Sequence, residues 1–376
     1  MLILAETLHR IDPFAIRIWG DFGIRWYGLS YVAGFFVSWL IVRALAKRGR
    51  SQLPVARAAD FIVTIAVGLV AGGRLGYCLI YNRPLLVDFS ADFPFWGVFA
   101  MHRGGMASHG GIVGLILACM WFARRNRVSA LHLLDLTTIG GTIGVFFGRI
   151  ANFVNGELVG RACSDKLPWA MKFPQDITEW ASSSKWSADH LRTLEPVMQL
   201  EPFNRMPGQW TALVDQAVAN PNPDTGQKIH DLLSRVVDAT QSSDPTGNAI
   251  AAQLTPLIAS RHPSQIYQAL MEGLALCIIL LLIWRVPRKP GVIAAWFLLG
   301  YGIFRIAGEQ FRVPDYDVNK LEQLTNITRG QWLSSIMVLA GIALLWLWAR
   351  RDVPKIGGWG KAGRDQTHPP PARPSD

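Results

Sequence analysis

Residues 265–284 read QIYQALMEGLALCIILLLIW and contain a single charged side chain, Glu272. A helix of about 20 residues spans about 30 Å, which is the thickness of the hydrocarbon core of a bilayer. Six further apolar stretches near this length lie at 24–42, 60–81, 105–123, 131–151, 291–309 and 331–349. We therefore predict an all-α membrane protein with seven transmembrane helices.

The composition supports a membrane protein. Apolar residues make up 50% of the 376 residues and charged residues 17%, whereas about a quarter of the residues of a soluble domain are charged. These fractions exclude collagen, a coiled coil, a disordered chain and a small disulfide-rich scaffold. The four cysteines are scattered, and no CxxC or His/Cys cluster indicates a metal site.

The net charge of +10 is distributed as in a membrane protein and does not predict nucleic-acid binding. The connections after the first, third and fifth apolar stretches carry eleven Lys and Arg residues, against five in the two short connections of the other parity. Because cytoplasmic loops are rich in basic residues, we expect the N-terminus outside and the C-terminus in the cytoplasm.

This topology divides the chain into four predicted regions. Residues 1–151 hold transmembrane helices one to four, and residues 263–349 hold helices five to seven. The polar segment 152–262 falls outside the membrane as a head, and its 12 acidic and nine basic residues give it a charge near −3. It is either a small external domain or a loosely ordered loop. Residues 350–376 form a predicted disordered cytoplasmic tail.

Glycines recur at four-residue spacing in two of the predicted helices. They are Gly68, Gly72 and Gly76 in the second helix, and Gly140, Gly144 and Gly148 in the fourth. Small residues at this spacing let helix backbones approach closely. We interpret both rows as packing surfaces and give them no chemical role.

Charged side chains in the hydrocarbon region are costly, so each one is a functional candidate. The predicted spans contain Asp60, Arg74, His109, Asp135, Arg149, Glu272, Arg305 and Glu309. Under the predicted topology most of this charge gathers in the outer half of the membrane, on Arg74, His109, Arg149, Arg305 and Glu309. Convergence from four spans predicts one shared site for an anion.

Each of these groups also has a structural interpretation. Arg74 can snorkel or brace a carboxylate, and His109 can be a hydrogen-bonded structural residue. The glycines around His109, in GGMASHGG at 104–111, permit a ligand to approach closely. Tyr301, Arg305 and Glu309 lie four residues apart on one helix face, where the charged pair can be purely structural.

The densest polar motif is GRIANFVNGELVGR at 148–161. Arg149 and Asn152 are three residues apart and share a helix face, and Asn155, Glu157 and Arg161 follow at the predicted membrane surface. A guanidinium binds a phosphate through two parallel hydrogen bonds, which partial dehydration strengthens. The motif therefore predicts a site for a phospholipid headgroup.

Residues 148–160 resemble the signature of the prolipoprotein diacylglyceryl transferases. Four more motifs follow that family's order: RWYG at 25–28, RGGMASHGG at 103–111, RHPSQIY at 261–267 and GYGIFRIAGEQFR at 300–312. The resemblance implies a multi-pass enzyme of the bacterial inner membrane. It would transfer the diacylglyceryl group of phosphatidylglycerol to the lipobox cysteine thiol of a prolipoprotein and release glycerol phosphate. Residues 175–260 depart from the family's head region in being longer and more polar.

The resemblance also assigns roles to single positions. The family's essential residues fall on His109, Arg149 and Arg305, with His109 as the base for the substrate thiol and the arginines on the phosphate. The positions implied to bind phosphatidylglycerol are Arg149, Tyr27, Asn152, Glu157, Gly160, Tyr301, Arg305 and Glu309. The implied partners are phosphatidylglycerol, the lipobox peptide and membrane lipids.

No cofactor or metal is predicted, because the sequence has no P-loop, dinucleotide fingerprint, His-rich cluster or acidic metal pair. The alternative function is a membrane transporter or a lipid-binding protein with an outer-leaflet anion site. The lack of an internal repeat and the gathering of the charges at one depth argue against transport.

Overall fold

The computed structural model describes residues 7–19, 22–91, 94–100, 104–182, 186–313 and 327–360. It divides into two compact units. The first unit comprises Met1–Ser30, Phe146–Met271 and Phe304–Ser335, and the second comprises Tyr31–Val145, Glu272–Ile303 and Ile336–Asp376. Arg103 and residues 361–376 of the predicted tail lie outside the described residues.

The described chain is mostly helical, and each predicted apolar stretch coincides with a helix. The single helices are α1 Trp26–Lys47, α2 Ala58–Ile80, α3 Ser108–Asn126, α4 Ala130–Val154, α13 Val292–Glu309 and α15 Arg329–Arg350. The stretch at 265–284 is built from α11 Ser264–Gln268, a π-helix at Ala269–Ala275 and α12 Leu276–Ile283.

Six of these helices are long and apolar enough to cross a membrane, and α3 is the exception among the described residues. It ends with Arg124 and Arg125 in its last turn, and these charges lower its apolar character. The structure therefore supports six spans by length and composition, one fewer than the seven predicted.

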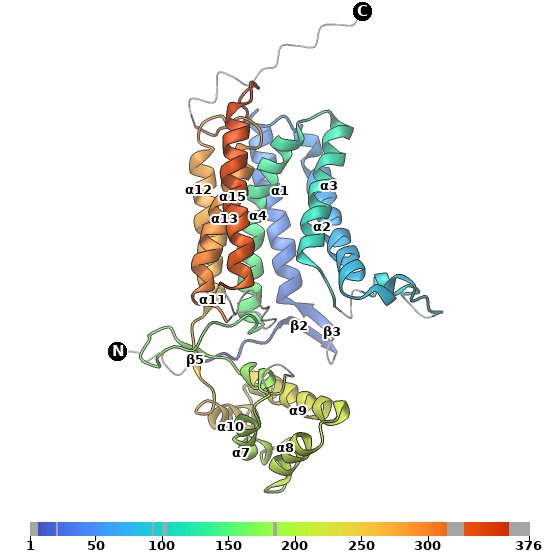
Figure 1. Ribbon diagram of the computed structural model, residues 1–376, viewed down its shortest axis with the longest axis vertical. Coiled ribbons are helices and arrows are strands. Elements are labelled where there is room, and N and C mark those ends of the chain that lie inside the picture. The colour runs from blue at the N-terminus through green and yellow to red at the C-terminus, as the bar shows by residue number, and fades with distance from the viewer. Residues whose placement is uncertain are drawn as a thin grey trace, which may run out of the picture. The chain divides into compact units, whose positions relative to one another are not determined.

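In the second unit, α2 and α3 lie side by side (Figure 1) and pack through glycines. A Cβ atom on Gly72 would collide with the backbone of Gly110 and Gly114 of α3, and one on Gly68 would lie 2.7 Å from the Gly114 carbonyl oxygen. The predicted packing role of the first glycine row is thus confirmed, and it depends on glycines of both helices.

In the second glycine row, Gly140 and Gly144 of α4 pack against α1. Ser38 Oγ of α1 donates a hydrogen bond of 3.2 Å to the Gly140 carbonyl of α4. A Cβ atom on Gly34 would lie 3.3 Å from Gly144 Cα. Gly148 differs, because a Cβ atom there would meet nothing within 4 Å.

Asp135 fixes the beginning of α13 in the second unit. Its carboxylate is almost fully buried and accepts hydrogen bonds of 2.8 Å from the backbone N–H groups of Gly291 and Ala294. Free N–H groups at a helix N-terminus favour such an anion. This buried carboxylate therefore has a structural partner.

The first part of the predicted tail is paired with the chain. Ile356 exchanges two backbone hydrogen bonds with Arg288, of 2.7 and 3.1 Å, and its carbonyl accepts one from Trp284 Nε1. Residues 352–360 thus differ from the disordered tail predicted over 350–376. The unit also contains 3₁₀ helices at Val55–Arg57, Arg83–Leu86 and Gly97–Phe99.

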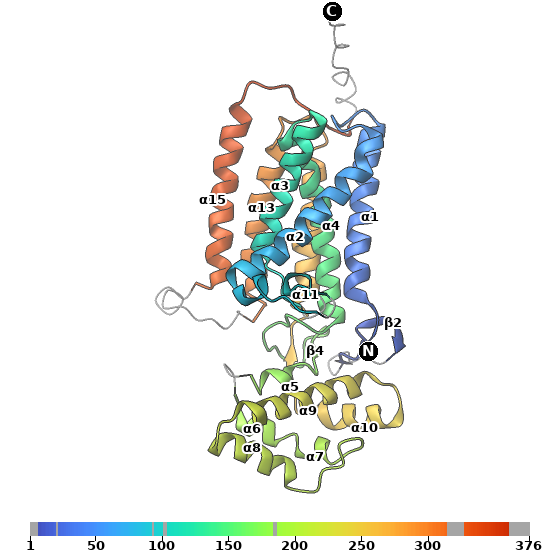
Figure 2. The same ribbon diagram turned by 90° about the vertical axis from the view of Figure 1, so that its right-hand side faces the viewer.

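Within the first unit, much of the segment 152–262 folds into helices around a buried core, and we call this part the head. Figure 2 shows its helices: α5 Asp176–Glu179, α6 Ala188–Arg192, α7 Glu195–Met198, α8 Gln209–Ala219, α9 Pro223–Gln241 and α10 Pro245–Leu254. They enclose a core of fully buried side chains that includes Trp210, Leu233 and Ile250. Trp210 Nε1 donates to the Leu191 carbonyl at 2.5 Å.

Two stretches of the head, NPNPDTG at 220–226 and QSSDPTG at 241–247, have turn-forming sequences, yet each contains the beginning of a helix. Asn222 caps α9 by accepting from the Asp224 N–H at 2.9 Å, and Asp244 caps α10 by accepting from the Gly247 N–H at 2.6 Å. Each cap is followed by a proline, which lacks the N–H that a first helical turn leaves unpaired.

Five short strands complete the first unit. β1 Thr7–Leu8 pairs in parallel with β4 Met171–Lys172, which pairs antiparallel with β5 Ser260–Arg261. β2 Phe14–Trp19 and β3 Phe22–Arg25 form an antiparallel hairpin. The hairpin leads directly into α1, which begins at Trp26.

Candidate anion-binding site

The centre of the candidate site is an ion pair in the first unit. Arg305 Nη1 donates to Glu309 Oε2 one helical turn further along α13, as the four-residue spacing predicts. The side chains are only 12% and 4% exposed. The other donors of Arg305, Nε and Nη2, have no partner among the described residues, so they are available to an anion.

Glu309 is held from a second side by the beginning of α15. Thr328 Oγ1 donates to Glu309 Oε1 at 3.1 Å. Thr328 and Gln331 also form a capping box, in which each side chain accepts from the backbone N–H of the other at 3.2 and 3.0 Å. A Cβ atom on Gly330 would lie 2.8 Å from Glu309 Oε1, so glycine leaves room for the carboxylate.

Sequence reasoning missed these supporting residues. The signal was the spacing of Thr328 and Gln331 directly before an apolar stretch, which is typical of a capping box. It predicts where α15 begins, but it does not reveal that the threonine hydroxyl faces Glu309.

The motif at 148–161 bends where α4 ends at Val154. Arg149 and Asn152 belong to the last turns of α4, and Asn152 is buried. Beyond the helix, Gly156 and Leu158 adopt left-handed conformations, with φ of 67° and 54°. These bends leave Glu157 on the surface, where its carboxylate accepts from Asn155 Nδ2 at 3.2 Å.

The motif at 261–267 holds this loop in place. Gln265 Nε2 donates to the Glu157 carbonyl at 2.6 Å, and Ser264 Oγ donates to the Leu158 carbonyl at 3.1 Å. Arg261 donates to the Gly160 carbonyl at 3.1 Å and forms an ion pair with Asp176 of the head. Hydrogen bonds therefore join two motifs that are about a hundred residues apart in sequence.

Gly160 lies where three backbone segments meet. Its N–H donates to the His262 carbonyl at 3.1 Å, and it forms an antiparallel bridge with Arg312 just beyond α13. A Cβ atom on Gly160 would collide with the His262 carbonyl. Its glycine identity is explained by this close backbone approach.

His109 and Tyr301 belong to the second unit. His109 is the second residue of α3, its side chain is exposed, and it has no hydrogen-bond partner among the described residues. Tyr301 stacks on Phe297 within α13, with ring centroids 5.6 Å apart. Tyr27 is in the first unit, near the beginning of α1, and is partly buried.

Arg74 has a different role from the shared anion site that was predicted for it. Its guanidinium is buried and donates to five backbone carbonyls of one loop, at distances of 2.5 to 3.2 Å. These are the carbonyls of Gly97, Val98, Ala100, Gly104 and Gly105. A guanidinium has five N–H donors, so none remains for a phosphate.

The loop that Arg74 holds leads directly to His109. Gly104 and Gly105 have φ of 76° and 86°, and a Cβ atom on Gly105 would collide with the ring of Tyr77. Ala107 then donates from its N–H to the Gly73 carbonyl at 2.9 Å. The beginning of α3 is thus bonded to α2 on both sides of the glycine pair.

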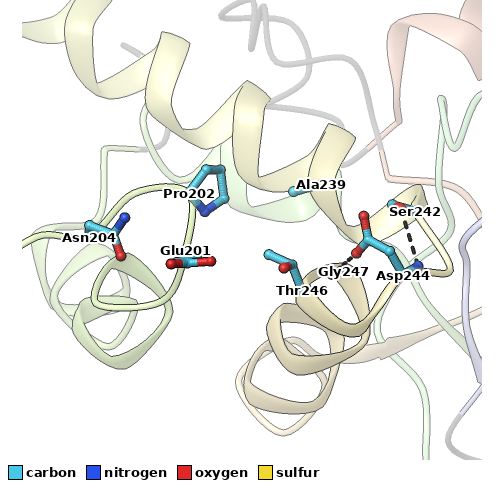
Figure 3. Close-up of a pocket in the computed structure, with 8 residues that line it drawn as sticks. All are labelled: Glu201, Pro202, Asn204, Ala239, Ser242, Asp244, Thr246 and Gly247. Atoms are coloured by element: carbon cyan, nitrogen blue, oxygen red, sulfur yellow. Dashed lines mark hydrogen bonds between the residues drawn. The ribbon is translucent and has the colours of Figure 1, made fainter.

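A pocket of about 410 Å³ in the head is a separate feature, because no predicted site residue lines it (Figure 3). Its only charged side chains are Glu201 and Asp244, and the Asp244 carboxylate is engaged as the cap of α10. The remaining lining residues are Pro202, Asn204, Ala239, Ser242, Thr246 and Gly247.

Together, these features define a helical membrane protein with a largely buried arginine, Arg305, that has two donor atoms without a partner among the described residues. A family model described as prolipoprotein diacylglyceryl transferase matches residues 13–347. The chain therefore belongs to the prolipoprotein diacylglyceryl transferase family.

Similar proteins are named phosphatidylglycerol–prolipoprotein diacylglyceryl transferase. One from Bdellovibrio bacteriovorus is 46% identical over 94% of this chain and 97% of its own length. Others are each 34% identical: one from Bradyrhizobium diazoefficiens over 94% of this chain and 98% of its own, and one from Serratia proteamaculans over 92% and 96%. Alignments this long include most of residues 175–260.

Proposed function

We propose that this chain transfers the diacylglyceryl group of phosphatidylglycerol to the lipobox cysteine of a prolipoprotein. Family membership over residues 13–347 and the names of the relatives support this reaction over the transporter alternative. The structural observation that carries the proposal is the buried Arg305–Glu309 pair, in which Arg305 keeps donors for a phosphate.

The reaction replaces a carbon–oxygen bond with a carbon–sulfur bond. The cysteine sulfur attacks the glycerol carbon that carries the phosphate ester, and a thioether forms as that C–O bond breaks. The bonding electrons leave with the phosphate oxygen, and glycerol phosphate is released. The proton of the thiol must go to a base, because the thiolate is the reactive form of cysteine.

Arg149 and Arg305 act on the phosphate in this proposal. A positive charge beside the leaving oxygen lowers the barrier to transfer most in a poorly solvated site, because electrostatic interactions are strong there. Burial of Arg305 supplies that condition, and Glu309 holds its guanidinium in one orientation. The planar fork of each arginine also fixes the phosphate through paired hydrogen bonds.

His109 is the proposed base, and its exposed side chain, which has no hydrogen-bond partner in the described part of the chain, suits that role. Asn152 and Glu157 are proposed to orient the glycerol hydroxyls of the headgroup. Tyr27 and Tyr301 are proposed to contact the same lipid. Gly160 acts indirectly, because it keeps the 157–160 loop against the chain that follows α13.

The proposed topology has seven spans in the bacterial inner membrane. Although α3 ends in two arginines, its close contact with α2 supports the proposal that it is the seventh span. The head and the N-terminus would lie on the periplasmic side, and the C-terminus in the cytoplasm, as the distribution of basic residues indicates.

The test is a mass assay of the purified full-length protein in phosphatidylglycerol liposomes with a lipobox peptide. We expect the peptide to gain a thioether-linked diacylglyceryl group. Arg149→Ala and Arg305→Ala should each lower the rate by about a hundredfold or more, as expected for lost charge stabilisation. Arg192→Ala is the matched control, because it removes an arginine from a surface ion pair of the head.

Two further variants separate the roles within the site. Arg305→Lys should remain impaired, because a point charge cannot reproduce the bidentate fork. Full activity of His109→Gln would remove the base assignment and leave the arginine roles intact. If the folded parent transfers nothing from phosphatidylglycerol or from other anionic lipids, the proposed reaction is wrong.

A further inference from the structure

A second basic site lies at the other end of α3 from His109. A pocket of about 320 Å³ lies where α3 leads into α4. It is lined by Met120, Ala123, Arg124, Arg127, Val128 and Ala130. The pocket thus combines two arginine side chains with an apolar wall, and none of the described residues that line it carries a carboxylate.

The guanidinium groups of the two pocket arginines lack partners among the described residues. Arg124 and Arg127 are exposed, and neither guanidinium group has a hydrogen bond or an ion pair with any described residue. Arg127 ends α3 in a left-handed conformation, with φ of 54°. The chain turns at Arg127, and the side chains of Arg124 and Arg127 line the same pocket.

An apolar stripe along α3 leads to the pocket. Val113 and Leu117 are 56% and 58% exposed, and with Met120 and Arg124 they follow the spacing of one helix face. An acyl chain that packs on this stripe would bring a phosphate to Arg124. The stripe and the two arginines thus match a phospholipid, which has both parts.

We propose that this pocket binds the phosphate of an anionic phospholipid whose acyl chain lies along α3. Basic pockets beside membrane helices are established sites for lipid headgroups, and guanidinium groups bind phosphate through paired hydrogen bonds. Arg124 lies fifteen residues after His109, which corresponds to about 22 Å along the helix. The lipid site is therefore separate from the end of α3 that carries His109.

The alternative explanation is that these arginines only reflect the general enrichment of basic residues at the cytoplasmic ends of membrane helices. That explanation applies equally to Arg125, which belongs to the same turn of α3 but does not line the pocket. A lipid site requires Arg124 and Arg127 and is indifferent to Arg125. Lipid binding by variants at Arg124 and Arg127, compared with variants at Arg125, therefore distinguishes a lipid site from a topology signal.

The experiment is a native mass spectrometry titration of the full-length protein in detergent with dioleoyl phosphatidic acid. Arg124→Gln/Arg127→Gln is compared with Arg125→Gln/Arg351→Gln, which removes the same charge from exposed positions outside the pocket. We expect the half-saturating lipid concentration for one bound lipid to rise about tenfold in the first variant only. Lipid bound elsewhere, including at Arg305, should not differ between the variants.

Comparison ligands identify what the pocket recognises. Dioleoyl phosphatidylcholine should bind more weakly than phosphatidic acid, and inorganic phosphate at equal concentration should not displace it. Displacement by phosphate would overturn the lipid assignment in favour of a soluble anion. Equal loss in both double variants, or no loss in either, would overturn the site. Unchanged unfolding temperatures and transfer rates would confirm that both variants fold.

Discussion

Two arginines of this protein show how the surroundings of a guanidinium decide its use. Arg74 gives all five N–H donors to backbone carbonyls of the 97–105 loop, so its function is to hold that loop. Arg305 gives one donor to Glu309, and its Nε and Nη2 have no partner among the described residues, which suits the phosphate role proposed for it. The Arg74 side chain is buried and that of Arg305 is 12% exposed, and sequence position alone does not distinguish their roles.

Arg74→Lys tests the holding role at the residue scale. Lysine has three donors and no planar fork, so at least two buried carbonyls would lose a charge-assisted partner. We expect the unfolding free energy to fall by about 2–4 kcal/mol. Transfer activity should fall with it, because the loop leads directly to His109. The measurements are thermal unfolding in detergent and the transfer rate in liposomes.

Arg83→Lys is the control for this prediction. Arg83 is exposed, and its side chain has one hydrogen bond to a described residue, the Leu79 carbonyl at 3.1 Å. Its replacement should change neither measurement. Equal stability of Arg74→Lys and Arg83→Lys would show that the five carbonyls do not depend on the guanidinium.

At the scale of an element, the beginning of α15 supports the candidate site. Thr328 caps that helix and also donates to Glu309. Thr328→Val removes both interactions at similar volume, and loss of an N-cap costs about 1 kcal/mol. We expect a small loss of stability and a larger loss of transfer rate, because Glu309 would hold Arg305 less firmly.

Thr328→Ser decides whether the hydroxyl causes this effect. Serine keeps the oxygen that caps the helix and donates to Glu309, so the transfer rate should return to near that of the parent. If serine and valine impair transfer equally, the methyl group matters and the hydrogen bond does not.

Packing of α2 against α3 leads to a prediction with a built-in control. Gly72→Ala places a Cβ atom against the backbone of Gly110 and Gly114, whereas Gly141→Ala meets open space in α4. Alanine favours a helix over glycine by about 1 kcal/mol. Gly141→Ala should therefore be neutral or stabilising, and Gly72→Ala should destabilise by about 1–3 kcal/mol. Thermal unfolding of both in detergent measures the difference.

The positions of the helices could be predicted from local sequence, whereas the paths of the loops and the partners of single side chains could not. About twenty apolar residues between polar connections leave a helix as the favoured structure, and the spacing of Arg305 and Glu309 predicts their pair. The path of the 97–105 loop around Arg74 has no periodic pattern, so its carbonyls could not be predicted. Asn222 and Asp244 follow turn-like sequence, and only the folded head identifies them as helix caps.

At the scale of the whole molecule, the first unit is assembled from segments that are far apart in sequence. β1, near the N-terminus, pairs with β4 of the head, and β4 pairs with β5 before α11. Arg10 adds hydrogen bonds to the Thr240 carbonyl at 2.5 Å and to Asn248 Oδ1 at 2.8 Å. The N-terminal residues thus hold the head to the chain that carries the candidate site.

We predict that His9 makes this assembly sensitive to acid. Its ring is buried and stacks on Phe173, with centroids 5.2 Å apart, and burial lowers the pKa of His9 from 6.5 to about 4. Between these pH values the unfolded chain binds a proton that the folded chain excludes. The contribution of neutral His9 to stability is complete above pH 6.5 and is lost as the pH falls toward 4, by at most about 3 kcal/mol.

The corresponding experiment compares the thermal unfolding of parent, His9→Gln and His230→Gln between pH 7.5 and 4.5. Carboxylates also titrate over this range, so the result is the difference in pH dependence of unfolding between the parent and each variant. His9→Gln should lose less stability on acidification than the parent, because glutamine binds no proton. His230 is exposed on α9, and its replacement should follow the parent. Parallel curves for all three proteins would contradict the role of His9, because the acid sensitivity would then belong to other groups.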